Sequence, residues 1–103
     1  MFNKVFEKGK IIFYHREEYR LIRKSGFFDP AYYLNNYPDV LKNNHDPLVH
    51  FIEQGWREGK NPSRKFDTKY YLEKNPDVNQ AGVNPLFHYL SKNQIARVLN
   101  GSI

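Results

Sequence analysis

The chain has 103 residues and a mass of 12.3 kDa, which suffices for one small domain with a modest core. It carries a formal net charge of +5, is 17% aromatic and contains no cysteine. The aromatic content argues against disorder. The lack of cysteine excludes disulfides, thiolate metal sites and thiol nucleophiles. No apolar run approaches the roughly 20 residues of a transmembrane helix, and no signal peptide is visible, so we expect a cytoplasmic chain.

The first segment in chain order, residues 1–27, holds most of the positive charge. It contains seven Lys and Arg residues against three Glu, whereas residues 28–103 contain nine against eight acidic residues. An apolar stripe over residues 3–25 predicts a basic amphipathic segment of one or two helices. Such a helix can meet an anionic membrane, a nucleic acid or an acidic protein, and a solvated surface is the simpler interpretation. The candidate contact residues are Arg16, Arg20, Arg23 and Lys24.

A duplication follows this segment. Residues 28–52 and 66–90 align without a gap at an offset of 38 residues, with 11 identical positions. A fixed period of this length is typical of units that stack on one another. We therefore divide the chain into a cap at 1–27, a first repeat at 28–65, and a second, truncated repeat at 66–103 with a C-terminal helix. The identical pairs are Phe28/Phe66, Asp29/Asp67, Tyr32/Tyr70, Tyr33/Tyr71, Leu34/Leu72, Pro38/Pro76, Asp39/Asp77, Val40/Val78, Pro47/Pro85, Leu48/Leu86 and His50/His88.

Each repeat is predicted to fold as helix, turn and helix. An aspartate N-cap opens the first helix, which ends at the residue before Pro38 or Pro76 because that residue avoids the α region. A short turn or helix follows, and the cap-plus-proline pairs Asp46-Pro47 and Asn84-Pro85 open the second helix. No segment alternates with period two over a useful length. We therefore predict an all-α fold of short helical hairpins.

Glycines mark the expected helix ends. Gly26 follows the N-terminal helix, Gly82 closes the short turn of the second repeat, and Gly55 is expected to end or bend a helix. The last helix is expected to extend through residues 91–100. Since a stack of fewer than three repeats is usually unstable, the terminal helices should act as caps. Otherwise the chain forms a homo-oligomer or belongs to something larger.

The polar side chains of the repeats have a structural and a chemical interpretation. The four repeated aspartates, Asp29, Asp39, Asp67 and Asp77, suit helix capping better than paired-carboxylate chemistry. No Walker loop, dinucleotide fingerprint, nucleophile elbow or His-Glu-x-x-His helix is present. We therefore expect no catalytic residues, no cofactor, no metal and no enzymatic activity.

Three further features are candidates for a contact surface. The repeated histidines can build a metal site or pH switch, or bond to a neighbouring turn as partly buried residues. The Trp-Arg dipeptide can stack on a sugar or peptide, or act as a packing wedge. In each Tyr-Tyr pair, one ring should face the core and its neighbour should lie about 100° around the helix. The candidates are Tyr32, Tyr70, Trp56, Arg57, His50 and His88.

The repeated strings resemble a tandem helical module of bacterial proteins. Residues 28–63 read FDPAYYLNNYPDVLKNNHDPLVHFIEQGWREGKNPS, and residues 66–90 read FDTKYYLEKNPDVNQAGVNPLFHYL. The family pattern is roughly FDxxYYLxxNPDVxxAGxxPLxHYxxxGxxEGRxPS, and the resemblance covers about residues 17–93. The module accompanies glycosyltransferases that build surface polysaccharides, including rhamnan-synthesis-like proteins, and occurs in some large bacterial surface proteins. This chain departs from the pattern at Asn43-Asn44 and at Asn93, and the second copy lacks the final tail.

The resemblance implies a non-catalytic scaffold or protein-interaction surface. Its partner would be a glycosyltransferase or another polysaccharide-synthesis component, in the cytoplasm or at the periphery of the inner membrane. No catalytic residue carries over to this chain. The alternatives are a saccharide-binding module with exposed aromatic residues, or a basic helix that binds a membrane or nucleic acid. Nucleic acid is disfavoured because no motif of that class is present.

Overall fold

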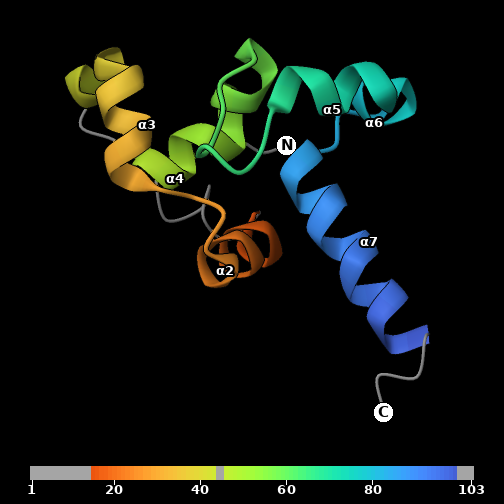
Figure 1. The fold of residues 1–103 in the computed structure, drawn as a ribbon. Coiled ribbons are helices and arrows are strands. Elements are labelled where there is room, and N and C mark those ends of the chain that lie inside the picture. The colour runs from red at the N-terminus through yellow and green to blue at the C-terminus, as the bar shows by residue number, and fades with distance from the viewer. Residues whose placement is uncertain (1–14, 44–45, 100–103) are drawn as a thin grey trace, which may run out of the picture.

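The computed structural model describes residues 15–43 and 46–99 (Figure 1). Within these ranges the fold is all-α, as predicted, and the one pairing of extended backbone is an isolated bridge between Ser63 and Phe66. No helix in the same ranges has the length and apolar character needed to cross a membrane. The rest of the predicted N-terminal helical segment lies outside the described residues.

The elements are α2 (Arg16–Ser25), α3 (Pro30–Asn36), the 3-10 helix η1 (Pro38–Asn43), α4 (Pro47–His50), the π-helix η2 (Phe51–Gly55), the 3-10 helix η3 (Trp56–Glu58), α5 (Thr68–Lys74), α6 (Pro76–Ala81) and α7 (Pro85–Leu99).

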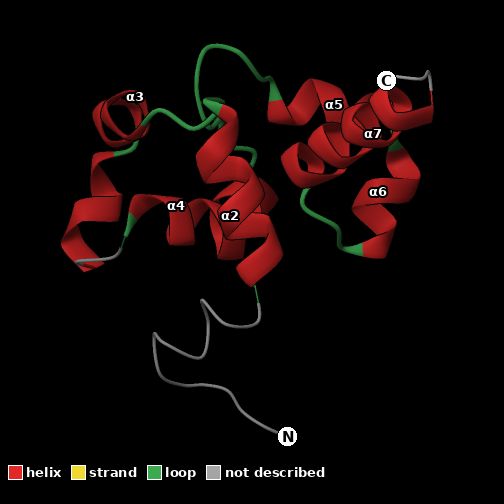
Figure 2. Ribbon diagram, turned by 90° about the horizontal axis from the view of Figure 1, so that it is seen from below, coloured by secondary structure: helices red, strands yellow, loops and turns green. Residues whose placement is uncertain are grey.

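The helices form two groups on either side of the loop at 59–67. Figure 1 shows α3, η1 and α4 in one group and α5, α6 and α7 in the other. Helix α2 packs against both α4 and α7, and it lies between the two groups when viewed from below (Figure 2). Directly after α2, the ring of Phe27 meets Tyr89 of α7 with centroids 5.8 Å apart. The N-terminal helix therefore covers apolar surface of both groups.

The buried core lies mainly in the first group. Most of its members fall between residues 22 and 56, where apolar side chains recur at helical spacing. Phe66 and Leu86 extend it into the second group, so one continuous cluster crosses the boundary between the groups. The buried members of this cluster are Ile22, Tyr33, Val40, Leu48, Phe51, Ile52, Trp56, Phe66 and Leu86.

Two kinds of side-chain cap begin the helices, as predicted. Asp29 and Asp67 each accept a hydrogen bond from the backbone N–H three residues ahead, at 3.1 and 3.0 Å. Asp46 and Asn84 each accept one from the backbone N–H two residues ahead, at 2.9 Å. The same local chemistry thus opens corresponding helices 38 residues apart.

Asp39 and Asp77 do not cap helices, so the capping prediction is wrong for this pair. Each lies directly after the proline that begins η1 or α6. The N-cap of α6 is Asn75, without a side-chain cap hydrogen bond. Both carboxylates are exposed in the first turn, where the positive end of the helix dipole favours them. They are therefore available for other contacts.

Glycines end two helices where expected and allow a close contact in a third. Gly26 and Gly82 follow α2 and α6 in the left-handed conformation, with φ of 78° and 71°. The helix that begins with α4 does not end at Gly55 but continues through η2 and η3 to Gly59, where φ is 81°. Gly55 has a helical φ of −58°. Glycine is required there because a Cβ would collide with the hydroxyl of Tyr33.

Hydrogen bonds fix the loop between the two groups. Thr68 donates through Oγ1 to the carbonyl of Lys60 at 2.8 Å and through its N–H to Asn61 Oδ1 at 2.8 Å. The N–H of Asp29 donates to the carbonyl of Pro62 at 3.0 Å. The loop is thereby bonded to the first helix of each group, which limits their relative movement.

Candidate functional site

A tyrosine–histidine hydrogen bond occurs in each helix group. Tyr33 Oη lies 2.8 Å from His50 Nδ1, and Tyr71 Oη lies 2.7 Å from His88 Nδ1. Burial, and then the charge of Glu58, raises the pKa of Tyr33, so its hydroxyl stays protonated at neutral pH. Among the described residues, no three His, Cys, Asp or Glu side chains gather where they could hold a metal. In each group a tyrosine on a helix occupies Nδ1 of the histidine ring, and the predicted bond from the ring to a turn stays a prediction.

Tyr33→Phe should lower the free energy of unfolding by about 1–3 kcal/mol, because it removes the hydroxyl partner of a buried ring nitrogen. Tyr71→Phe is the matched control. It should cost less, because Tyr71 and His88 are half-buried and water can replace the lost bond. Urea unfolding monitored by helical circular dichroism measures both losses. Equal losses, or no loss at Tyr33, would contradict the structural role of the buried pair.

Trp56 is a core residue and does not form an exposed stacking platform. Its side chain is 2% exposed, and the indole Nε1 donates to the carbonyl of Ile52 at 3.0 Å. Arg57 is exposed, with its guanidinium carbon 4.5 Å from the centre of the indole ring. The packing interpretation is therefore correct for Trp56, and the interpretation of Trp56 as an exposed contact residue is wrong. Of this dipeptide, Arg57 is the member that a partner can reach.

The two tyrosine pairs divide between core and surface. Tyr33 is 0% exposed and Tyr70 is 58% exposed. Tyr32 is partly buried, and Tyr71 is partly buried against the core cluster. Tyr70 is therefore the more accessible of the two predicted contact tyrosines, and Lys74 Nζ lies 5.6 Å from the centre of its ring. Tyr32 and Tyr70 belong to different helix groups.

The four basic candidates of α2 lie together on its exposed side. Arg16, Arg20 and Arg23 are spaced by four and three residues, Lys24 follows, and all four are exposed. Ile22, on the other side of the helix, is fully buried. Within the described part of the chain, none of the four basic residues forms an ion pair. We call Arg16, Arg20, Arg23 and Lys24 the α2 basic face.

One side-chain contact lies within the first turn of α2, and a second joins α2 to the cap of α4. A hydrogen bond with Glu18, at 2.6 Å, raises the pKa of His15, and this effect outweighs the opposing effect of burial. The charged ring therefore adds stability below pH 6.5, and this contribution is lost as the pH rises through the raised pKa. Tyr19 donates its hydroxyl to Asp46 Oδ2 at 2.7 Å, which raises the pKa of Tyr19. The first contact stabilises the start of α2, and the second fixes α2 against the start of α4.

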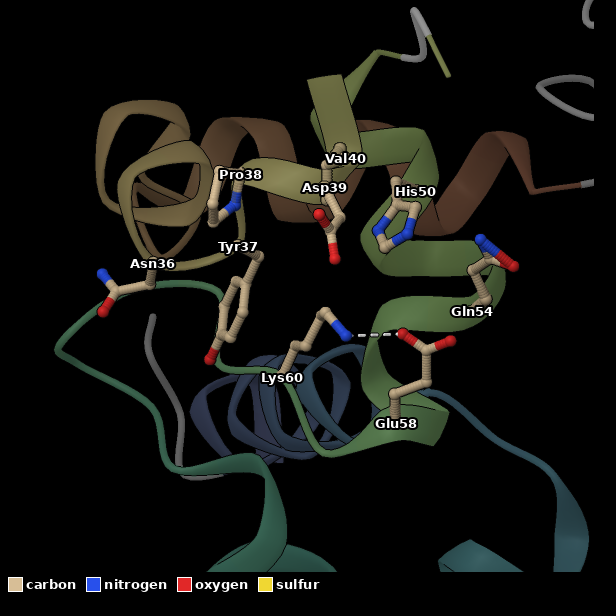
Figure 3. Close-up of a pocket in the computed structure, with 9 residues that line it drawn as sticks. All are labelled: Asn36, Tyr37, Pro38, Asp39, Val40, His50, Gln54, Glu58 and Lys60. Carbon is tan, nitrogen blue, oxygen red and sulfur yellow. Dashed lines mark hydrogen bonds and ion pairs between the residues drawn. The ribbon is translucent and has the colours of Figure 1, made fainter. Parts of the chain in front are cut away.

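A polar pocket of about 540 Å³ lies between the α3–η1 segment and the helix formed by α4, η2 and η3. Figure 3 shows Tyr37, Asp39, His50 and Lys60 pointing toward the same space. Lys60 Nζ lies 2.6 Å from Glu58 Oε1 at its lower edge (Figure 3). We call this the Tyr37 pocket.

Of the contact residues predicted from the sequence, His50 alone lines the Tyr37 pocket. Apart from Asp39, which is repeated as Asp77, the aromatic and charged residues of the lining occupy positions at which the two repeats differ. Tyr37 corresponds to Asn75, for example, and Gln54 corresponds to Lys92. The sequence signal for this site is a set of polar residues in the first repeat that the second repeat lacks. A comparison that looks only for identical positions misses these residues.

Comparison with known proteins adds no assignment to these surfaces. No protein-family model matches the chain, and no curated protein or solved structure matches it either. The resemblance drawn from the repeated strings therefore remains a prediction. The α2 basic face and the Tyr37 pocket are the two surfaces that can carry a function.

Proposed function

We propose that this chain is a non-catalytic helical interaction module that docks on a partner protein through the α2 basic face. The observation that carries this proposal is the exposure of four cationic side chains along one side of α2. The opposite side of the helix packs into the core, so the cations are presented on a fixed support. An acidic protein surface is the complementary partner, because opposite potentials speed encounter and set the orientation of docking.

Apolar surface beside the α2 basic face favours a protein partner. Arg20 and Lys24 border a hollow of about 380 Å³ between α2 and α7, together with Leu21 and Phe87. Protein interfaces commonly combine a small apolar centre with a charged rim. A partner with carboxylates around one apolar side chain would match both parts of this surface.

The burial of the apolar side of α2 argues against membrane docking. A helix that binds at a membrane surface places its apolar side in the lipid and its cations at the headgroups. In α2, Ile22 is fully buried and Tyr19 packs against the core cluster. The helix therefore has little apolar surface to insert, and attraction by charge alone would be weak and salt-sensitive.

The repeated strings suggest which partner the module serves. Their resemblance to a glycosyltransferase-associated module points to a glycosyltransferase or another component of surface-polysaccharide synthesis. On this proposal the chain acts in the cytoplasm, at or near the inner membrane where such enzymes assemble. Hydrogen bonds that recur 38 residues apart support a scaffold role. In them the histidines bond to tyrosines and the aspartates cap helices, so these repeated residues stabilise the fold.

Reversing the charge of the α2 basic face should abolish capture of the partner. The full chain, tagged, is used to recover proteins from lysate of the source bacterium, and the recovered proteins are identified by mass spectrometry. For a recovered polysaccharide-synthesis component, the affinity should fall at least about tenfold in the variant, because like charges then face each other across the interface. The variant is Arg16→Glu/Arg20→Glu/Arg23→Glu.

A control with the same change in net charge separates docking from general repulsion. Arg64, Lys74 and Lys92 are exposed residues outside α2, and the triple change of these to Glu should leave capture intact. Equal loss in both variants, or recovery of no polysaccharide-synthesis component by the wild-type chain, contradicts the proposal. Binding to anionic vesicles that the α2 variant loses, without protein capture, would assign the surface to a membrane instead.

A further inference from the structure

We propose that the Tyr37 pocket binds a neutral, polyhydroxylated ligand of the size of one or two sugar units. None of the residues that line the pocket belongs to α2. The inference is therefore independent of the proposed docking function, and substitutions in one surface leave the other unchanged. Four features of the pocket support it: its size, its one ordered wall, its mixture of polar groups and its restriction to the first repeat.

The pocket has the size and rigidity of a ligand site. Its volume of about 540 Å³ lies within the usual range of small-molecule pockets, about 300–1,000 Å³. The hydroxyl of Tyr37 accepts a hydrogen bond from the N–H of Asn61 at 3.0 Å, and its ring packs edge-on against Tyr33 at 5.1 Å. Val40 and His50 in the wall are buried. A ligand would therefore meet one ordered wall, formed by Tyr37, Val40 and His50, while the side chains of Asp39, Gln54 and Glu58 are exposed.

The lining combines hydrogen-bond acceptors and donors. Asp39 and Glu58 supply carboxylate oxygens, Lys60 supplies ammonium protons, and the amide of Gln54 supplies both kinds of group. A sugar hydroxyl both donates and accepts, so it can bond to all of these groups. The Tyr37 ring adds an aromatic wall for the C–H surface of such a ligand, beside the Lys60 ammonium that lies 5.3 Å from the ring centre.

The charges in the pocket favour a neutral ligand over an anion. Lys60 is paired with Glu58 at 2.6 Å, which leaves Asp39 as the excess charge. The cation closest to Asp39 is Lys42 at 3.6 Å, and both side chains are largely exposed, so this pair is weak. The pocket therefore carries a net negative charge that repels phosphates and carboxylates. Asp39 also retains accessible oxygens that can accept hydroxyl protons.

The second repeat shows which of these residues the fold itself requires. The proline, aspartate, valine and histidine of the wall recur there, at Pro76, Asp77, Val78 and His88. The remaining side chains do not recur, although the corresponding helices α5, α6 and α7 form without them. The helices of a repeat therefore form without these non-repeated side chains. The differing pairs are Asn36/Lys74, Tyr37/Asn75, Gln54/Lys92, Glu58/Ala96 and Lys60/Val98.

Titration by two-dimensional amide NMR of the full chain tests the proposal. The neutral probes are maltose, cellobiose and diacetylchitobiose, and the charged probes are glucose 1-phosphate and spermidine. At least one neutral probe should shift amide signals at residues 36–40, 50–54 and 58–60, with weaker effects at residues 74–78. Asp39→Asn and Gln54→Ala should each weaken this binding by about tenfold. The first replaces a charged acceptor oxygen by an amide donor, and the second removes the amide altogether.

The corresponding positions of the second repeat provide matched controls. Asp77→Asn and Lys92→Ala change exposed residues that correspond to Asp39 and Gln54, and they should leave the affinity unchanged. The proposal is overturned if no neutral probe shifts the pocket signals at tens of millimolar. It is also overturned if spermidine or glucose 1-phosphate binds there more tightly than every neutral probe, or if the control variants weaken binding equally.

Discussion

Trp56→Ala should lower the free energy of unfolding by about 3–5 kcal/mol, a large part of the stability of a domain of this size. The side chain is 2% exposed and belongs to the cluster that joins the two helix groups. Truncation leaves a cavity that the surrounding helices can fill only in part. It also removes the hydrogen bond from the indole Nε1 to the carbonyl of Ile52. Chemical denaturation followed by helical circular dichroism measures the loss.

The neighbouring Arg57 supplies the control for this substitution. Arg57→Ala removes an exposed guanidinium above the Trp56 ring and should cost about 0.5–1 kcal/mol. A small loss at Trp56 together with intact helicity would mean that the indole is not part of the core. The comparison also bears on function. Any binding lost in Trp56→Ala alone would reflect unfolding rather than a missing contact with a ligand.

Gly55→Ala has the second largest expected effect, a loss of about 2–3 kcal/mol. A Cβ at this position would collide with the Tyr33 hydroxyl oxygen and lie 3.3 Å from Tyr33 Cζ. The tyrosine cannot move away freely, because it is 0% exposed and bonded to His50. The backbone of Gly55 is helical, so alanine suits it locally. The whole penalty should therefore come from the collision, and thermal or urea unfolding measures it.

A double-mutant cycle identifies the collision as the cause. Tyr33→Phe removes the hydroxyl that the new methyl group would strike. The loss in Gly55→Ala/Tyr33→Phe should then be clearly smaller than the sum of the two single losses. Gly82→Ala is a contrasting control, because nothing lies within 4 Å of its Cβ and its cost of about 1 kcal/mol arises from a φ of 71°. Strict additivity in the cycle would refute the steric explanation.

Local sequence signals were sufficient for the class of fold and for most helix boundaries. Caps, prolines and left-handed glycines act within a few residues, so Asp29, Asp67, Gly26 and Gly82 have the roles that their neighbours predict. Helical periodicity likewise indicated an all-α chain. The same local reasoning failed at Asp39, which follows the helix-opening proline rather than preceding it.

Long-range packing settled the features that matter for function. Trp56 lies at helical spacing from Leu48 and Ile52, which favours burial, and the core cluster it joins includes Ile22 and Tyr33 from earlier helices. Gly55 is needed because Tyr33, 22 residues earlier, approaches its backbone. The Tyr37 pocket joins α3 and η1 to the end of the next helix and the loop at Lys60. Short-range rules describe contacts along the chain, whereas burial and pockets depend on which segments meet across it.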